Sequence, residues 1–255
     1  MADRPGISVD RRWRAAGIGA LIFAAVALTG ALGVAHARHE QPMPIVSSAP
    51  LGNNQKPKKV VVIGDSFTED APLGAVGAKS WHQLAFRQLR KEGVDITAEI
   101  SREGGSGYVA RGYRGTTFGE KARRLLEPDD DLVIIFGATG DASEKPESVA
   151  AAVSDTFSFV RTASPRAKFI AVGPVSAPAY SSPEVARVRD VVRDEAAKTD
   201  AIFVDPIADQ WFVGQPNLIR EDGLHPTDAG HAYIAERLLP IMQRVLEPGA
   251  PRSEG

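Results

Sequence analysis

Short runs of apolar residues with helical patterns between them constrain the fold of this chain more than any other feature. Most of these runs are apolar throughout, which is typical of strands buried on both faces. Helices between such strands indicate a parallel sheet covered on both sides. We therefore expect one α/β domain over 58–247 in the order βαβαβαβαβα. The runs that predict strands are 60–63, 96–100, 132–136, 169–172 and 202–204.

Apolar residues at helical spacing follow the predicted strands. Ser182-Pro183 is a favourable helix start, because serine can cap a helix and proline fits its first turn. Pro240 is expected to kink or break the closing helix. The residues that predict inward helix faces are Trp81, Leu84, Ala85 and Leu89; Val149, Val153, Phe157 and Val160; Val185, Val188 and Val192; and Ile234, Leu238 and Ile241.

The N-terminus predicts the compartment. Three arginines, Arg11, Arg12 and Arg14, precede an uncharged, largely apolar run over 15–35. That length fits a signal sequence or a single membrane span, and Ala35-His36-Ala37 fits a small-x-small cleavage site. The basic flank should remain in the cytoplasm, so the rest of the chain is expected outside, either secreted or anchored through 15–35.

The remaining segments follow from composition. We expect a leader or anchor over 1–37, a proline-rich linker over 38–57, the α/β domain over 58–247 and a flexible tail over 248–255.

The chain of 255 residues has no cysteine, which excludes a thiolate nucleophile and a cysteine-based zinc site. A net charge of −2 without a basic stripe predicts no nucleic-acid partner. Metal and phosphate motifs are absent from the sequence, so we expect no metal and no cofactor.

Two motifs stand where a parallel sheet places its site, beyond the carboxyl ends of the strands. Ser66 follows the first strand, and a serine at a tight strand-to-helix turn exposes its hydroxyl beside free backbone N–H groups. Asp222 and His225 precede the last helix. The carboxylate can hold one imidazole nitrogen as N–H and leave the other as a base. Together they predict a Ser66, His225 and Asp222 triad.

The motifs at 64–67 (Gly-Asp-Ser-Phe) and 222–226 (Asp-Gly-Leu-His-Pro) resemble those of the SGNH (GDSL-type) hydrolase superfamily of serine esterases and lipases. The resemblance spans about 58–247. It implies a three-layer α/β/α sandwich with a five-stranded parallel, flavodoxin-like sheet. It also implies that Ser66 is the nucleophile, His225 the general base and Asp222 its orienting acid.

The resemblance further implies an oxyanion hole with three donors. They are the N–H of the nucleophile, here Ser66, a glycine N–H after the second strand, and an asparagine amide after the third strand. Gly105 is the predicted glycine, and Gly107 is the alternative in a register uncertain by two residues.

The third motif departs from the family pattern, because 137–141 reads Gly-Ala-Thr-Gly-Asp without an asparagine. Gly140 stands where the amide is expected. Losing one oxyanion donor costs roughly 100- to 1000-fold in turnover. Three explanations stay open: Thr139 or a backbone N–H such as that of Gly140 substitutes, Asn217 reaches in, or the enzyme is slow or inactive.

Other residues carry smaller predictions. Tyr108 and Trp211 are candidate substrate contacts, although Trp211 fits core packing equally well. The glycine-rich loop 101–119, which contains Tyr113 and Arg114, suits either a mobile segment covering the substrate or a solvated loop. His231 is expected to be structural.

The expected function is that of an extracytoplasmic serine hydrolase that cleaves carboxylic esters through an acyl-enzyme. Its substrate would be a small-molecule, glycan or lipid ester, with the cell envelope as the source. One alternative is an O-acyltransferase that passes the acyl group to a glycan hydroxyl. The other is a weakly active or inactive domain that binds glycans. The sequence does not determine the oligomeric state.

Overall fold

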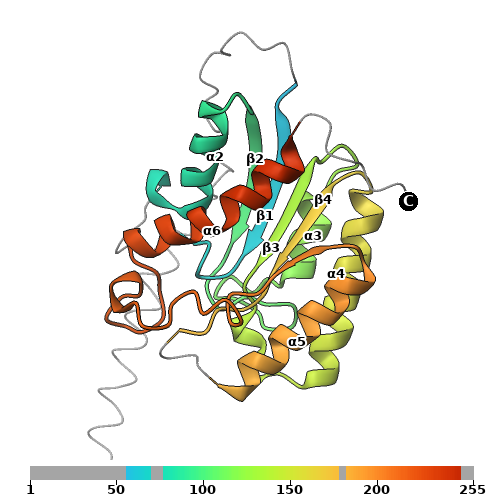
Figure 1. Ribbon diagram of the computed structural model, residues 1–255. Coiled ribbons are helices and arrows are strands. Elements are labelled where there is room, and N and C mark those ends of the chain that lie inside the picture. Colours follow the sequence, from blue (N-terminus) through green and yellow to red (C-terminus); the bar gives the residue numbers. More distant parts are fainter. Residues whose placement is uncertain (1–55, 70–76, 178–181, 248–255) are drawn as a thin grey trace, which may run out of the picture. The chain divides into compact units, whose positions relative to one another are not determined.

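The computed structural model describes residues 56–69, 77–177 and 182–247 (Figure 1). The predicted leader and its cleavage site, the linker up to residue 55 and the tail from residue 248 lie outside these ranges and stay predictions. Within the described ranges, no helix is long and apolar enough to cross a bilayer.

A five-stranded parallel sheet in the order β2-β1-β3-β4-β5 forms the centre of the domain. This order is flavodoxin-like. Both the predicted sheet and the predicted alternation of strands and helices are confirmed. The strands are β1 (Lys58–Gly64), β2 (Ile96–Arg102), β3 (Leu132–Phe136), β4 (Lys168–Val172) and β5 (Ile202–Val204).

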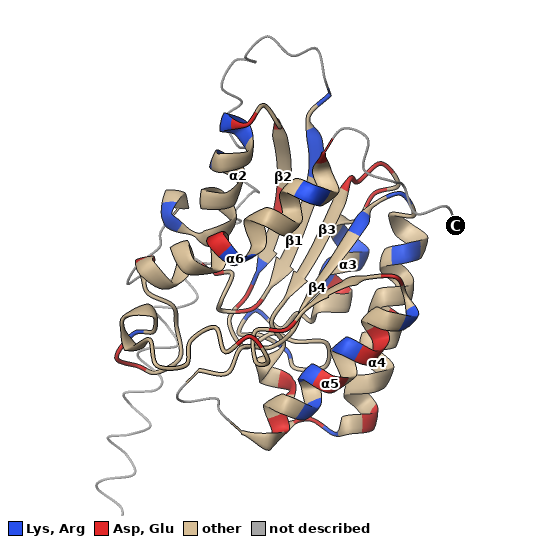
Figure 2. Ribbon diagram, viewed as in Figure 1, with Lys and Arg blue, Asp and Glu red and all other residues tan. Residues whose placement is uncertain are grey.

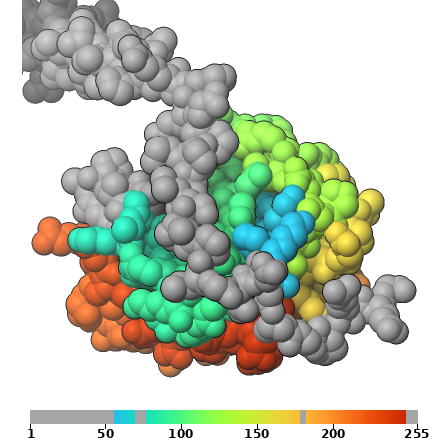
Figure 3. Space-filling model, turned by 90° about the horizontal axis from the view of Figure 1, so that it is seen from above, coloured from blue at the N-terminus to red at the C-terminus, as the bar shows by residue number. Residues whose placement is uncertain are grey.

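Helices cover both faces of the sheet, which gives the predicted three layers (Figure 1). Helices α2 (Trp81–Lys91) and α6 (Asp228–Leu246) pack side by side on one face, as a second view also shows (Figure 3). The other face is covered by α3 (Phe118–Leu125), α4 (Pro146–Ala163) and α5 (Pro183–Lys198). Short 3-10 helices are η1 (Gly77–Lys79), η2 (Thr139–Ser143) and η4 (Pro216–Leu218).

The side chains of β1 alternate between two hydrophobic clusters. Val60 and Val62 pack under α2 and α6, whereas Val61 and Ile63 pack under α3 and α4. All four are at most 2% exposed. Full burial of each such side chain is worth about 1.5–3 kcal/mol. The strand that leads to Ser66 is therefore packed on both faces. The charged residues of the domain lie mainly on the outer helix faces and in the loops (Figure 2).

Local signals explain most of the helix boundaries. Helix α5 starts at Pro183 as predicted, and the Ser182 hydroxyl accepts the Val185 N–H at 3.4 Å. Of the predicted kink or break at Pro240, the break is wrong, because α6 continues through this residue, and the kink stays a prediction. Pro240 lies on the exposed face, where water can replace the lost hydrogen bond, while Leu238 and Met242 anchor the helix in the core.

Candidate active site

The loops that follow the strands meet at the carboxyl edge of the sheet, at the lower end of Figure 1. The loop after β5 reaches the nucleophile turn through an aromatic contact. The ring of Phe212 lies 5.9 Å from the ring of Phe67, the residue after Ser66. Sequence positions about 150 residues apart are thereby brought to one edge.

Asp222 and His225 form a hydrogen-bonded pair. Asp222 Oδ2 lies 2.8 Å from His225 Nδ1, and Oδ1 accepts the backbone N–H groups of Leu224 and His225 at 2.8 and 3.0 Å. Although desolvation opposes it, these hydrogen bonds lower the pKa of Asp222 to about 2. The ionised carboxylate accepts a hydrogen bond from Nδ1–H, so in the neutral imidazole Nε2 carries the free lone pair.

Backbone hydrogen bonds close the segment that carries this pair into a tight turn. The N–H of Arg220 donates to the His225 carbonyl at 2.9 Å, and the N–H of Thr227 donates to the Leu218 carbonyl at 2.9 Å. Ile219 and Pro226 form an antiparallel bridge. The relative position of Asp222 and His225 is therefore set by local backbone geometry.

A chain of hydrogen bonds ties the start of α6 to the nucleophile turn. His231 Nδ1 accepts the Trp81 backbone N–H at 3.3 Å, and Trp81 Nε1 donates to the Thr68 hydroxyl at 3.4 Å. His231 is buried, and burial lowers its pKa to about 4. The structural role predicted for His231 agrees with these contacts.

Ser66 lies directly after β1 and is half-buried. Its side chain makes no hydrogen bond with any described residue, His225 included. Catalytic hydrogen bonds in free enzymes are often long and form only with substrate bound. The structure thus unites Asp222 and His225 in one hydrogen-bonded pair and leaves Ser66 without a partner among the described residues.

Asp65 connects the nucleophile turn to the loop after β3. Its carboxylate accepts the N–H groups of Phe67 at 2.9 Å and Ala138 at 3.1 Å. Burial raises its pKa to about 6 against the opposing effect of these donors. A Cβ on Gly137, whose φ is 121°, would lie 2.2 Å from the Asp65 carboxylate, so the contact requires glycine there.

Asp141 connects the loop after β3 to the loop after β2. Its buried carboxylate accepts three consecutive backbone N–H groups, those of Tyr108, Val109 and Ala110, at 2.7, 3.0 and 2.7 Å. Two carboxylates, Asp65 and Asp141, therefore hold the three loops around Ser66 in one arrangement.

The glycine beside the nucleophile is Gly104. A Cβ built on Gly104 would lie 3.7 Å from Ser66 Cβ, whereas one on the predicted Gly105 would meet only the Gly112 backbone, at 4.0 Å. The N–H of the alternative Gly107 donates to the Ala110 carbonyl at 2.9 Å, and the N–H of Gly104 is likewise hydrogen-bonded, to Glu69, so Gly107 also stays a prediction. The N–H of Gly105 has no acceptor among the described residues, so Gly105 stays a prediction next to Gly104.

The loop after β3 has no room for the expected asparagine in its present conformation. A Cβ on Gly140 would lie 2.7 Å from the Gly105 carbonyl oxygen. The hydroxyl of Thr139 is buried and finds no hydrogen-bond partner in the described part of the chain. Asn217 lies exposed in η4. Position 140 therefore needs glycine, because the loop after β2 passes close to it. The three predicted alternatives for the third oxyanion donor stay predictions.

The two predicted substrate contacts lie in the core. Tyr108 is 4% exposed and packs edge-to-face against Phe118 and Phe157. Trp211 is 1% exposed and packs against Phe136 and Tyr233. Their observed role is packing, which lends no support to the prediction that they touch substrate.

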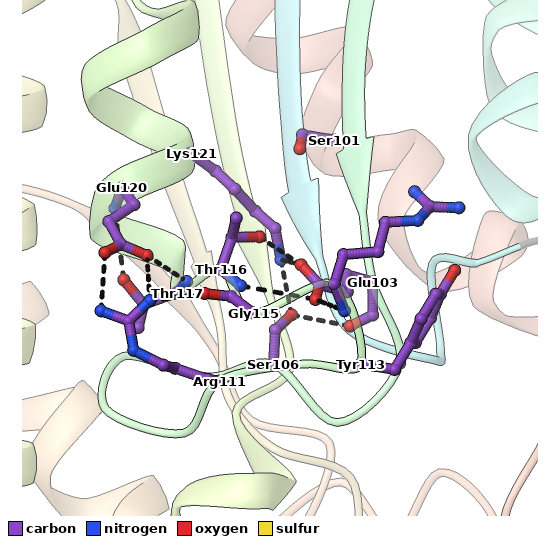
Figure 4. A network of polar contacts seen from close by, with 12 residues as sticks. Ser101, Glu103, Ser106, Arg111, Tyr113, Gly115, Thr116, Thr117, Glu120 and Lys121 are labelled. Atoms are coloured by element: carbon purple, nitrogen blue, oxygen red, sulfur yellow. Dashed lines mark hydrogen bonds and ion pairs between the residues drawn. The ribbon is translucent and has the colours of Figure 1, made fainter. Parts of the chain in front are cut away.

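A buried ion pair supports the loop after β2. Lys121 Nζ lies 3.3 Å from Glu103 Oε2 and donates to the Ser106 hydroxyl at 2.7 Å, with both charged side chains at most 2% exposed. The same carboxylate accepts the hydroxyl of Thr116 and the N–H of Arg114. Figure 4 shows these groups around Glu103. Hydrogen bonds therefore hold the segment 112–116 in a defined turn, and both alternatives for loop 101–119, a segment covering the substrate and a solvated loop, stay predictions.

Tyr113 is an exposed aromatic residue on this turn, next to Gly104, and the sequence predicted no specific role for it. Its side chain is 63% exposed, and its Cδ1 would lie 3.7 Å from a Cβ on Gly104. Its hydroxyl is hydrogen-bonded to Glu69, three residues after Ser66. Glu69 was missed altogether, although its place in the nucleophile turn was a usable signal.

A flavodoxin-like sheet with a serine after β1 and an Asp-His pair before the last helix has the architecture of a serine hydrolase of the SGNH class. Residues 62–233 match the model of the GDSL-like lipase/acylhydrolase family. The chain is also 39% identical over 203 residues to "GDSL lipase Rv0518" of Mycobacterium tuberculosis (strain ATCC 25618 / H37Rv), which covers 78% of this chain and 88% of that protein. The chain belongs to the GDSL-like lipase/acylhydrolase family and is an enzyme that hydrolyses esters.

Solved structures agree on the fold. The crystal structure of TesA matches with a TM-score of 0.62 at 20% identity, covering 74% of this chain and 99% of TesA. The native aryl esterase of M. smegmatis matches with a TM-score of 0.58 at 18% identity, covering 74% of this chain and 99% of that chain. At these identities the likeness concerns the fold alone.

Proposed function

We propose that this protein hydrolyses carboxylic esters through an acyl-enzyme on Ser66, with His225 as general base and Asp222 as its orienting acid. The observation that carries the proposal is the Asp222–His225 pair, whose 2.8 Å hydrogen bond directs the imidazole lone pair away from the carboxylate. A base fixed in this tautomer can accept the proton of a serine hydroxyl.

The chemistry follows from these roles. Nε2 of His225 takes the Ser66 proton while Oγ bonds to the ester carbonyl carbon, and the carbonyl electrons move onto the oxyanion. As the oxyanion collapses, the bond to the alcohol breaks and His225 returns the proton to the leaving oxygen. Water then attacks the acyl-enzyme with its proton taken by His225, and the carboxylic acid leaves as Ser66 regains a proton.

The oxyanion would be held by the N–H of Ser66 and by a glycine N–H of the loop after β2. The Ser66 N–H makes no hydrogen bond within the described residues, so it is available to substrate. Gly104 is the glycine of this loop whose Cβ position lies 3.7 Å from Ser66 Cβ. Fixed donors of this kind stabilise the transition state without reorganisation.

We also propose that the enzyme works outside the cytoplasm on acyl esters of envelope glycans or lipids. The arginine-flanked apolar run over 15–35 and the Ala35-His36-Ala37 site support an exported domain. Protease added to intact cells that express the full chain should degrade the catalytic domain. Protection equal to that of a cytoplasmic marker would contradict the proposed location.

Fluorophosphonate labelling tests the nucleophile. The wild-type protein should be labelled, with the modified peptide containing Ser66, and Ser66→Ala should lose both the label and esterase activity. Ser158→Ala, in the exposed part of α4, is the matched control and should behave as wild type. Esterase activity that survives Ser66→Ala in pure protein would refute the mechanism.

A further inference from the structure

One backbone donor next to the nucleophile is already occupied by a carboxylate. The N–H of Gly104 donates to Glu69 Oε2 at 2.7 Å. Gly104 is the glycine whose Cβ position lies 3.7 Å from Ser66 Cβ. Glu69 therefore sits where a negatively charged oxygen would be bound during ester cleavage.

The carboxylate is held there from a second side. Its other oxygen, Oε1, accepts the hydroxyl of Tyr113, and the Tyr113 N–H donates to the Gly104 carbonyl at 3.3 Å. Burial and the hydrogen bond to Glu69 raise the pKa of Tyr113 to about 12, so its hydroxyl remains a donor at neutral pH.

The turn that presents Tyr113 is itself fixed. Glu103, in its buried ion pair with Lys121, accepts the N–H of Arg114 and the hydroxyl of Thr116, which follow Tyr113 in the turn (Figure 4). The Gly112 N–H donates to the Thr116 carbonyl at 3.2 Å, which closes the turn. The Glu69 carboxylate thus accepts hydrogen bonds from two donors that the fold holds in place, the Gly104 N–H and the Tyr113 hydroxyl.

We propose that Glu69 limits the rate of ester hydrolysis by competing with the carbonyl oxygen of the substrate for the Gly104 N–H. The proposal rests on the proposed Ser66 mechanism. A carboxylate accepts a stronger hydrogen bond than a neutral ester carbonyl does. Substrate must therefore displace Glu69 before Gly104 can stabilise the oxyanion, and a carboxylate left nearby opposes the developing negative charge.

Removing the carboxylate charge is the direct test. Glu69→Gln and Glu69→Ala should raise kcat/KM for p-nitrophenyl acetate by at least about tenfold, a fraction of the 100- to 1000-fold that one oxyanion donor is worth. Glu99→Gln, an exposed glutamate of β2, is the charge-matched control and should leave kcat/KM at the wild-type value. The rate of fluorophosphonate labelling should rise in parallel, because the phosphonyl oxygen uses the same donors.

Tyr113→Phe provides an independent variant. It keeps the ring and removes only the hydroxyl that holds Glu69. We expect a smaller rise in kcat/KM than in Glu69→Ala, and no further rise when the two changes are combined. A purely structural role for Glu69 predicts the reverse, a lower thermal unfolding midpoint with unchanged or reduced labelling.

The outcomes separate this inference from the proposed mechanism. If wild-type activity depends on Ser66 but neither Glu69 variant exceeds it, the competition by Glu69 is refuted and the mechanism stands. If activity does not depend on Ser66 in any variant, the mechanism fails and the inference falls with it. An inactive wild-type enzyme with a Ser66-dependent Glu69→Ala variant would support both.

Discussion

At the scale of single residues, the exposed Asp222–His225 pair depends on one carboxylate. Asp222 accepts three hydrogen bonds, two from backbone N–H groups and one from His225 Nδ1. It therefore sets both the turn and the tautomer of the base. Loss of the carboxylate charge should affect chemistry far more than folding, because the side chain is 40% exposed.

We expect Asp222→Asn to lower kcat/KM by about 1,000-fold or more, because an amide that faces Nδ1 favours the wrong imidazole tautomer. The unfolding midpoint should stay nearly unchanged. Steady-state hydrolysis of p-nitrophenyl esters measures the loss. Asp209→Asn, an exposed aspartate on the same loop, should retain wild-type activity. Equal losses in the two variants would mean that charge on the loop, and not the contact with His225, is responsible.

The sequence identifies such residues when a single motif contains the whole interaction. Asp222 and His225 are three residues apart, so their pairing could be predicted from spacing. The contact between Glu69 and Gly104 joins two loops 35 residues apart, and its partners are a backbone N–H and a tyrosine hydroxyl. No spacing rule describes such a contact, because it depends on how two loops end beside each other.

At the scale of elements, the strands were predictable because residues 60–63 of β1 and all of β3 are apolar and buried on both faces. The loops after β2 and β3 were not. Their arrangement depends on Asp65 and Asp141, each of which accepts N–H groups from a distant loop. The choice between Gly105 and Gly107 was uncertain for the same reason, because the Asp141 carboxylate that holds the following segment comes from another loop.

Asp141→Asn tests whether this link positions the oxyanion loop. An amide keeps one acceptor oxygen but turns an NH2 group toward a backbone N–H. We therefore expect a loss of about 2–4 kcal/mol in the free energy of unfolding. Since the loop after β2 would then move relative to Ser66, kcat should fall more than KM changes.

Asp155→Asn, on the exposed face of α4, is the control for a lost aspartate charge. Its ion pair with Arg123 is exposed, and such pairs contribute about 0–1 kcal/mol. Chemical denaturation and steady-state kinetics on both variants make the comparison. If Asp141→Asn unfolds like Asp155→Asn, the three hydrogen bonds to the 108–110 segment do not hold the loop.

At the scale of the whole molecule, two helices far apart in sequence close one face of the sheet. Helix α2 follows the first strand and α6 ends the domain, and they pack side by side (Figure 3). Apolar periodicity predicts that each helix has an inward face but does not say which helix is its neighbour. The hydrogen bond from the Trp81 N–H to His231 is therefore a property of the assembled domain.

Burial of His231 predicts that the stability of the whole domain depends on pH. Its pKa is about 4 in the folded protein, below the 6.5 of an unfolded histidine. Between these values the unfolded chain binds more protons, so the free energy of unfolding should fall as pH drops from 6.5 to 4, by about 3 kcal/mol from this group. His82, whose pKa burial lowers to about 3, acts in the same direction, and Asp65, whose pKa is raised to about 6, opposes it above its unfolded value of 3.8.

His231→Asn isolates the contribution of His231 from those of the other two groups. An asparagine oxygen can accept the Trp81 N–H in place of Nδ1, but it does not titrate. Urea unfolding at a series of pH values from 4 to 7.5 should therefore give a variant that is less stable than wild type at pH 7.5, because the ring is lost from the core. The difference between the two proteins should shrink steadily as the pH falls from 6.5 towards 4. A difference that stays constant over that interval would show that His231 is not held neutral by its burial between α2 and α6.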